Sequence, residues 1–162
     1  MTDRLELTPL RVEDAEEMAA VLAADDLYTF IGGTPPSVDQ LRDTYSRQVT
    51  GGSEEEQWHN WIVRADGEAV GYVQATVTAD QAEIAWVIGK PWQGKGYASE
   101  AAKTMIGLLS SRGIMRIVAH IHPDHEASNG VARRLGLRPT RDFYDGERRW
   151  VLDLSGPSTT AG

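Results

Sequence analysis

A short apolar stretch, a glycine-containing loop and an amphipathic helix follow one another in the middle of the chain. Residues 82–88 read Ala-Glu-Ile-Ala-Trp-Val-Ile, which is typical of a buried strand, and two loop glycines, Gly94 and Gly96, come soon after. Apolar residues then recur at helical spacing over residues 98–109. A strand that enters a helix through such a loop directs backbone N–H groups and the positive helix end at one spot beyond the sheet. The segment therefore predicts a fold in which a loop at a strand end can hold an anion.

The residues of this loop suit a phosphate group. Gly94 and Gly96 leave room for a phosphate oxygen to approach the backbone, Lys95 adds a positive charge, and Ser99 adds a hydroxyl donor. A lone Gly-Lys-Gly triplet is in most chains an ordinary turn followed by a helix cap. The P-loop pattern G-x-x-x-x-G-K-[ST] and the dinucleotide pattern G-x-G-x-x-G are both missing here. A phosphate-binding role therefore depends on what the rest of the chain contains.

The elements around this segment predict a mixed α/β (α+β) sheet. A strand over residues 5–9, helices over 14–24 and 37–49, and strands over 59–64, 69–78 and 82–88 come first. The dipeptide Asp66-Gly67 is typical of tight hairpins, so these last three strands are expected to form an antiparallel meander. A helix over 98–109 that ends at Gly113, a strand over 114–122, a helix over 127–135 capped by Gly136 and a hairpin around Asp145-Gly146 follow. We expect one domain over residues 1–154, with a parallel crossover in its second half, and a flexible tail over residues 155–162.

The charge balance and the lack of cysteine restrict the chemistry. The 162 residues include 16 Lys and Arg against 24 Asp and Glu, a formal net charge of -8, and no Cys. The chain has no thiolate nucleophile, and an acidic chain is a poor general nucleic-acid binder because phosphate contacts need a basic face. No apolar run reaches the roughly 20 residues of a membrane span and MTDRLELTPL is no signal peptide, so we expect a cytoplasmic protein without a membrane partner. The acidic balance favours cationic partners such as amines or basic peptides.

Two motifs together resemble the GNAT superfamily of N-acetyltransferases. The run Gln93-Gly94-Lys95-Gly96-Tyr97-Ala98 fits the family signature [QR]-x-x-G-x-[GA], and the preceding Trp86-Val87-Ile88 is similar to the family's fourth strand. Further along, His125-Glu126-Ala127-Ser128 and residues 131–137 resemble the second motif, which reads N-x-x-S before an apolar, basic, L-G run in the branch that acetylates ribosomal-protein N-termini. The resemblance covers residues 4–154. It implies a GNAT-like fold with an antiparallel N-terminal meander and a splayed parallel pair formed by the fourth and fifth strands.

The resemblance implies acetyl-CoA as co-substrate and no metal. The cofactor-binding loop would consist of Gln93, Gly94, Lys95, Gly96, Tyr97, Ala98 and Ser99, with the backbone amides of its glycines and of residues 97–99 on the pyrophosphate. The pantetheine would pair with exposed backbone of Trp86, Val87 and Ile88, as an added strand does. Arg134 matches a basic position that meets the 3′-phosphate in the family. The alternative for Arg134 is a solvated arginine on a helix.

The resemblance also implies roles for three residues near the reacting groups. Ser128 keeps the position that in this branch donates a proton to the departing CoA thiolate, and Glu83 is similar to an acidic residue that holds a water as base. A serine packed near a helix start and a glutamate at an exposed strand edge are the plain structural alternatives. His125 stands where the family has an Asn that helps to hold the pantetheine, so this contact is weakened or remade by the imidazole. The implied reaction is direct acetyl transfer to a primary amine, either of a small molecule or of a protein N-terminus.

Several alternatives stay open at this point. A non-catalytic acyl-CoA sensor on the same fold, or an enzyme that uses another acyl donor, would carry the same loop. His120, His122 and His125 form an H-x-H-x-x-H pattern without a full set of metal ligands, and a base role for His120 or His122 is favoured over metal binding. Tyr28 and Phe30 lie in the stretch that borders the acceptor site in the family. Homodimers are common in the family, so a homodimer is one option, but no heptad or apolar patch identifies an interface.

Overall fold

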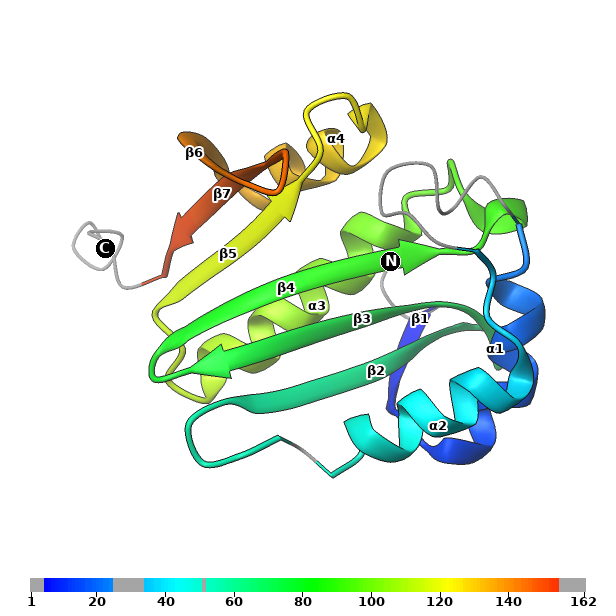
Figure 1. The fold of residues 1–162 in the computed structure, drawn as a ribbon. Helices are drawn as coiled ribbons and strands as arrows, with labels where there is room; N and C mark the ends of the chain where they lie inside the picture. Colours follow the sequence, from blue (N-terminus) through cyan, green and yellow to red (C-terminus); the bar gives the residue numbers. More distant parts are fainter. Residues whose placement is uncertain (1–4, 25–33, 51, 155–162) are drawn as a thin grey trace.

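Seven strands build one mixed sheet in the computed structural model, which describes residues 5–24, 34–50 and 52–154. The strands lie in the order β1-β2-β3-β4-β5-β7-β6 (Figure 1). Their bounds are Leu5–Pro9 for β1, Gln57–Ala65 for β2, Glu68–Thr78 for β3, Gln81–Ile88 for β4, Arg116–Ile121 for β5, Arg138–Tyr144 for β6 and Glu147–Asp153 for β7. The helices are α1 (Ala15–Val21), α2 (Val38–Gln48), α3 (Tyr97–Ser111) and α4 (Glu126–Leu135), with 3-10 turns at Val12–Asp14 and Lys90–Trp92. No helix in these described ranges is long and apolar enough to cross a bilayer.

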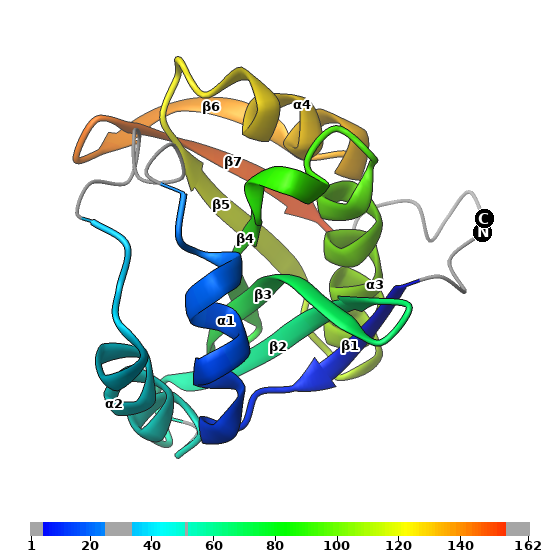
Figure 2. The ribbon, with the colours of Figure 1, turned by 90° about the vertical axis from the view of Figure 1, so that its right-hand side faces the viewer.

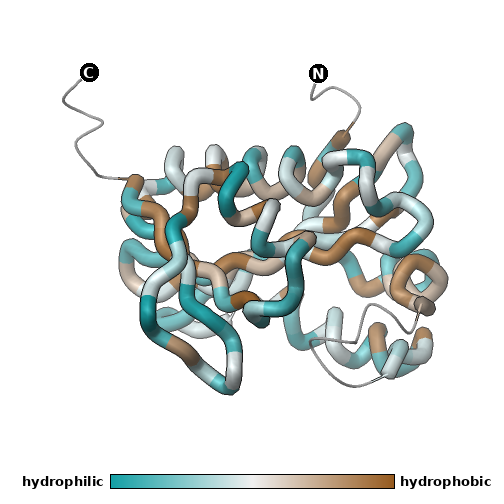
Figure 3. The backbone as a smooth tube through the Cα atoms, turned by 90° about the horizontal axis from the view of Figure 1, so that it is seen from above, coloured by the Kyte–Doolittle hydropathy of each residue, from teal (hydrophilic) through white to brown (hydrophobic). Residues whose placement is uncertain are grey.

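Helices cover both faces of the sheet and enclose two apolar cores. α1 and α2 lie on one face, called here the α1–α2 face, and α3 lies on the other, the α3 face (Figures 1 and 2). Met105 and Leu109 of α3 are fully buried in the larger core, where they join Ile117 of β5. Met18 of α1 is fully buried with Ile62 of β2 in the smaller core. The hydrophobic colour follows the strands through the middle of the molecule, as burial of one strand face on each core requires (Figure 3).

The tight turns follow the local chemistry of their residues. Asp66 and Gly67 have φ of 53° and 84°, and Asp145 and Gly146 have φ of 50° and 81°. Two consecutive residues with positive φ make the hairpin turn whose twist matches that of the flanking strands. Gly136 ends α4 with φ of 93°, as a left-handed cap does. Both Asp-Gly hairpins and the glycine cap are thereby confirmed.

The pairing of β4 with β5 ends soon after it begins. These parallel strands are in register at three positions, and the last of them joins Glu83 to Val118. β4 then continues to Ile88 and β5 to Ile121, and the two strands diverge towards their carboxyl ends (Figure 1). The mixed α/β sheet with an antiparallel meander and a splayed parallel pair is confirmed, and the gap opens where α3 and α4 begin.

Some element bounds differ from the prediction. α1 ends at Val21, three residues earlier than the periodicity indicates. β6 extends over Arg138–Tyr144, whereas the pattern predicts only its last two residues as strand. β6 is the outermost strand of the sheet and its residues are almost all exposed, so no apolar alternation marks it in the sequence. The predicted tail over residues 155–162 falls outside the described residues.

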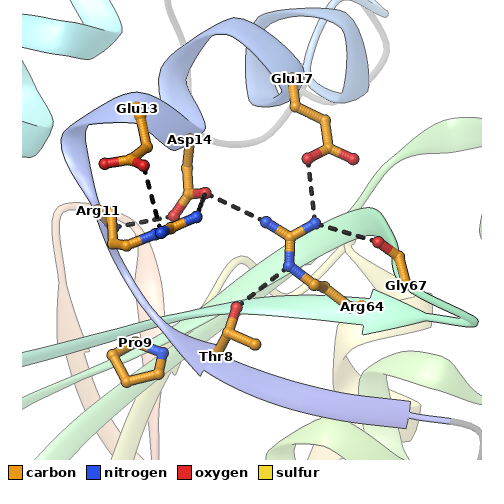
Figure 4. Close-up of a pocket in the computed structure, with 8 residues that line it drawn as sticks. All are labelled: Thr8, Pro9, Arg11, Glu13, Asp14, Glu17, Arg64 and Gly67. Carbon is orange, nitrogen blue, oxygen red and sulfur yellow. Dashed lines mark hydrogen bonds and ion pairs between the residues drawn. The ribbon is translucent and has the colours of Figure 1, made fainter.

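A half-buried arginine of β2 fastens α1 to the sheet, two strands away from the gap. Arg64 of β2 donates to Asp14 at 3.1 Å, to Glu17 at 3.0 Å and to the Gly67 carbonyl at 3.3 Å (Figure 4). The Ala69 N–H also donates to Glu17, and this hydrogen bond, together with Arg64, lowers the pKa of the Glu17 carboxyl. The stabilisation from Glu17 is therefore present above its unfolded pKa and is lost as the pH falls through the folded value. The hollow drawn in Figure 4 is lined by this ionic cluster, which has a structural function.

Replacing Arg64 with methionine is expected to lower the free energy of unfolding by about 3 kcal/mol. Asp14 is only 4% exposed, so it would stay buried without its main charged partner. Urea denaturation measures the loss. Arg42→Met is the matched control, because Arg42 pairs with Asp39 at 3.1 Å on the surface of α2 and such pairs contribute less than about 1 kcal/mol. Equal losses in the two variants would mean that Arg64 contributes no more than a surface ion pair.

Candidate active site

The loop between β4 and α3 contains two glycines in the left-handed backbone conformation. Gly94 has φ of 80°, and Gly96, the N-cap residue of α3, has φ of 83°. A Cβ at either position would meet no atom of the described residues within 4 Å, so the backbone conformation is what favours glycine here. Gln93 Nε2 donates to the Ile88 carbonyl at 2.9 Å. Gln93, predicted as a cofactor ligand, thus uses its amide nitrogen to fasten the loop to the end of β4.

Backbone amides at the start of α3 point out of the helix end beside this loop. The Glu100 N–H donates to the Gly96 carbonyl at 3.1 Å, which leaves the amides of Ala98 and Ser99 without an acceptor inside the helix. The helix dipole adds positive potential at the same end. Lys95 lies in the same loop and is exposed. The arrangement has the chemistry of an anion site.

Arg134 reaches this helix end from α4. Its Nη1 donates to Ser99 Oγ at 3.3 Å, although the two residues are 35 positions apart in the sequence. The neighbouring Arg133 points elsewhere, since its guanidinium lies over the Trp150 ring at 5.5 Å from the centroid. The fold therefore directs one of the two helix arginines to the loop and the other over the Trp150 ring.

Among the described residues, no strand lies beside one edge of β4 once β5 has diverged. The Gly89 N–H donates to the Val70 carbonyl at 2.7 Å, and the backbone groups of successive residues alternate between the two edges of a strand. The backbone groups of Trp86 and Ile88 therefore point into the gap, whereas those of Val87 point towards β3. Of the three residues predicted to pair with an extended ligand, Trp86 thus presents its backbone to the gap, whereas the carbonyl of Ile88 already accepts a hydrogen bond from Gln93.

The first turn of α4 places Ser128 next to His125. Ser128 Oγ lies 3.4 Å from His125 Nε2, and His125 is the N-cap residue of α4. Burial, and then the nearby His122, lower the pKa of His125, so its imidazole is neutral at pH 7. Asn129 is buried and donates to the Pro123 carbonyl at 2.9 Å. The predicted serine and histidine therefore meet at the helix start, and Asn129 fastens the turn before it.

Glu83 and His120 form a pair at the point where the strands separate. Glu83 Oε2 lies 2.9 Å from His120 Nδ1. Glu83 is in register with Val118, and His120 lies two residues further along β5. The side chains of Glu83 and His120 therefore both project from the α1–α2 face of the sheet. The ring of Tyr144 stands edge-on to the imidazole, with 5.2 Å between centroids. Glu83 and His120, which were predicted as two separate candidates for the base, are in direct contact in the fold.

Glu147 at the start of β7 belongs to the same cluster and is missed by the sequence patterns. Burial raises the pKa of its carboxyl, and the charges of Glu83 and Asp145 act in the same direction, against those of His120 and His122. Glu147 follows a hairpin turn without any motif around it, so nothing local marks it. A carboxylate with a raised pKa beside a histidine is typical of proton-transfer sites.

The three histidines of the H-x-H-x-x-H pattern have different partners. His120 contacts Glu83, His122 Nδ1 accepts the Asp124 N–H at 3.1 Å, and His125 contacts Ser128. Within the part of the chain that the structure describes, no three His, Cys, Asp or Glu side chains are grouped so that they could hold a metal ion.

A polar pocket lies on the α1–α2 face beside Glu83. Its lining residues come from α2, β2 and β3 and are Thr44, Arg47, Gln48, Trp58, Asn60, Gln74, Ala75 and Thr76. Thr76 is directly opposite Glu83 in the β3–β4 pairing, which places the pocket one strand away from the carboxylate. Its volume of 260 Å³ is below the roughly 300 Å³ of a complete small-molecule site, so it suits part of a ligand. Tyr28 and Phe30, predicted to border an acceptor, lie outside the described residues.

Comparisons with known proteins identify relatives with the same architecture. A family model described as an acetyltransferase (GNAT) domain matches residues 4–138. An uncharacterized N-acetyltransferase of Bacillus licheniformis is 28% identical over 160 residues, which cover 93% of this chain and 89% of that protein. The structure of RimL, a ribosomal alpha-N-protein acetyltransferase in complex with coenzyme A, superimposes with a TM-score of 0.81 at 17% identity over 93% of this chain and 94% of that one. The microcin self-immunity acetyltransferase MccE, in complex with acetyl-CoA and AMP, gives a TM-score of 0.79 at 16% identity over 93% of both chains.

Proposed function

This chain belongs to the acetyltransferase (GNAT) family, and we propose that it transfers an acetyl group from acetyl-CoA directly to a primary amine. The observation that carries the proposal is the gap between β4 and β5 beyond Glu83, with an anion-binding loop at its mouth. Proton-transfer groups lie on either side of this gap, on β4 and β5 and at the start of α4. The CoA and acetyl-CoA complexes of RimL and MccE support the same co-substrate.

The residues around the gap fit the parts of acetyl-CoA. We assign the pyrophosphate to the loop from Gly94 to Gly96 and to the first amides of α3, where two positive-φ glycines and the helix end favour an anion. The pantetheine is assigned to the open edge of β4 at Trp86, whose backbone groups have no strand partner on that side. Arg134, held beside Ser99, is assigned to the 3′-phosphate.

Acetyl transfer moves one proton from the ammonium to a base before attack and a second proton from the nitrogen, after attack, to the sulfur that leaves, and the chain has a group for each movement. Bound acetyl-CoA supplies the activated acyl group, and the new C–N bond replaces its C–S bond. Ser128 is the proposed acid, because its hydroxyl can donate to the sulfur that leaves. The proton of the ammonium goes to the pair of Glu83 and His120. Binding both reactants in one gap contributes further acceleration through orientation.

The acceptor is either a protein N-terminus or a small-molecule amine. RimL is a ribosomal alpha-N-protein acetyltransferase and MccE is a microcin self-immunity acetyltransferase, so proteins of this fold serve different functions. None of the eight residues that line the polar pocket is acidic, and Arg47 among them is a cation. Such a pocket disfavours a second ammonium group next to the reacting amine. It suits acceptors that continue in amide or hydroxyl groups, which Asn60 and Gln74 can bind.

The proposal is tested by binding and then by turnover. Calorimetric titration with acetyl-CoA should give micromolar affinity. Mass spectrometry should then detect acetylation on a panel of peptides and small amines, with simple polyamines among the poorer acceptors. Absence of acetyl-CoA binding would contradict the proposed function. Binding without acetylation of any amine would indicate an acyl-CoA-binding protein that is not an enzyme.

Arg134→Gln is expected to weaken CoA binding about 10-fold, because a charge-assisted hydrogen bond contributes roughly 1.5 kcal/mol. Dephospho-CoA lacks the 3′-phosphate, so it should bind more weakly than CoA to the wild type and equally to the wild type and the variant. Arg133→Gln is the matched control, since it removes the same charge one position away, where the guanidinium lies over Trp150. If Arg134→Gln weakens CoA and dephospho-CoA alike, Arg134 does not bind the 3′-phosphate.

A further inference from the structure

The second ring nitrogen of His120 is buried and has no hydrogen-bond partner among the described residues. Its side chain is only 15% exposed, whereas that of the paired Glu83 is 56% exposed. A buried polar atom left without a partner costs about 1–3 kcal/mol, and such atoms in native proteins are few. An apolar residue would pack at this position at lower cost, so the imidazole has a use beyond packing.

Glu83 determines which nitrogen of His120 carries the proton. An ionised carboxylate only accepts hydrogen bonds, so the contact of 2.9 Å requires Nδ1 to donate. In the neutral ring Nε2 then has the lone pair and is able to accept a proton. A carboxylate behind a histidine orients the ring and stabilises its charged form in the triads of hydrolytic enzymes. The pair has the same geometry here, without a nucleophile.

Charged and titratable groups face His120 from each neighbouring strand. They are Glu83 on β4, Tyr144 on β6, and Glu147 and Arg149 on β7, with Arg149 directly opposite His120. His122 beyond the end of β5 and Asp145 in the β6–β7 turn act in turn on Glu147. Two carboxyl groups, those of Glu83 and Glu147, thus lie near His120 together with one guanidinium. A carboxylate beside the imidazole attracts an ammonium group.

We propose that His120 Nε2 takes the proton from the ammonium group of the acceptor, and that Glu83 is the positioning residue that orients His120. The inference rests on the proposed acetyl transfer and assigns one of its two proton movements. The N–H bond of the ammonium breaks, its electron pair stays on the nitrogen, and the proton bonds to Nε2. The neutral amine then has the lone pair that attack on an acyl carbon requires. The imidazole of His120 becomes a positively charged imidazolium beside Glu83. The imidazolium then releases the proton to solvent.

The pH dependence of kcat/KM separates the functions of the two residues. In the wild type, kcat/KM should rise with pH in two steps. The first rise comes from loss of the proton on the catalytic base, and the second, which is common to all variants, comes from loss of the proton on the free amine. His120→Asn should lower kcat by about 100-fold or more and remove the first rise, because an amide still donates to Glu83 but takes no proton. Glu83→Gln should keep the first rise and shift it to lower pH, because the neighbouring negative charge is lost.

Nitrogen NMR of the histidine rings gives a second readout without acetyl-CoA. His120 should be the Nδ1–H tautomer in its neutral form, and Glu83→Gln should weaken this preference, because a neutral amide can either accept from Nδ1 or donate to it. A dominant Nε2–H tautomer would contradict the proposal. So would the reverse pH result, in which Glu83→Gln removes the first rise and His120→Asn only shifts it.

Controls separate this inference from the fold and from the proposed function. His59→Asn changes a histidine on β2 that lies 3.4 Å from Arg112, and it should leave the pH profile unchanged. His120→Gln replaces His120→Asn if the latter fails to fold, and acetyl-CoA affinity reports the integrity of either variant. If the wild type acetylates no amine, the proposed function fails together with this inference. Normal acetylation with an unchanged first rise in the His120 variants contradicts this inference alone.

Discussion

Replacing Gly96 with valine is expected to weaken acetyl-CoA binding by at least about 100-fold, because two charge-assisted hydrogen bonds of roughly 1.5 kcal/mol each are lost. Gly96 has φ of 83° and caps α3, and the space beyond its Cα contains no atom of the residues that the structure describes within 4 Å. A branched side chain would therefore occupy the space in which a phosphate oxygen approaches the loop. It would also pull the backbone from the left-handed conformation and misdirect the amides of the helix end. Calorimetry with acetyl-CoA measures the loss.

Gly113→Val is the matched control for this experiment. Gly113 follows the other end of α3 with φ of 90°, and a Cβ there would likewise meet no atom of the described part of the chain within 4 Å. The two substitutions therefore carry similar backbone strain, roughly 1–2 kcal/mol each, at opposite ends of one helix. Gly113→Val should bind acetyl-CoA like the wild type. Equal binding by the two variants would show that the loop at Gly96 does not hold the pyrophosphate.

Replacing Ser128 with alanine is expected to lower kcat by about 100-fold and to leave acetyl-CoA affinity unchanged. The hydroxyl is the proposed donor to the departing sulfur, and without it the thiolate must leave unprotonated. Alanine preserves the first turn of α4, since the Ser128 side chain makes only a long contact of 3.4 Å with His125. Steady-state kinetics with a saturating amine, together with calorimetry, separates the two effects.

Ser110→Ala provides the comparison, because Ser110 is an exposed serine near the far end of α3. It should retain both kcat and affinity. An unchanged kcat in Ser128→Ala would mean that another group, or water, protonates the sulfur. A loss of affinity in Ser128→Ala would assign the serine to binding and not to proton transfer.

Features with a local cause could be predicted from the residues alone. The Asp66-Gly67 turn adopts positive φ at both positions because only such residues tolerate this conformation at low cost. Ser37 caps α2 by accepting the Gln40 N–H at 3.1 Å, as its hydroxyl and the spacing to Gln40 indicate. Neighbours within four residues decide these features. Most of β6 could not be predicted, because an edge strand that is exposed on both faces has no alternation of apolar and polar residues.

Features that join distant segments could not be predicted in this way. Glu83 and His120 are 37 positions apart, and their hydrogen bond depends on the register that sets Glu83 against Val118. Shifting that register by one residue would turn the histidine to the other face of the sheet. Glu147 joins the same cluster only because β7 pairs with β5 across the sheet. The pKa of Glu147 is raised mainly by burial, and no pattern of neighbouring residues in the sequence indicates that this side chain is buried.

The sequence by itself determined the phosphate-type loop, the helix caps, the hairpins and the family to which the chain belongs. Each of these depends on residues close together in the chain, where backbone conformation and hydrogen bonding are local. Only the tertiary structure decided which side chains meet around the gap: Arg134 and not Arg133 at the start of α3, and Glu83 behind His120. Strand register and helix packing set these contacts, and both depend on burial of the whole apolar surface. The candidate site therefore combines a locally encoded loop with a Glu83–His120 pair that exists only in the folded sheet.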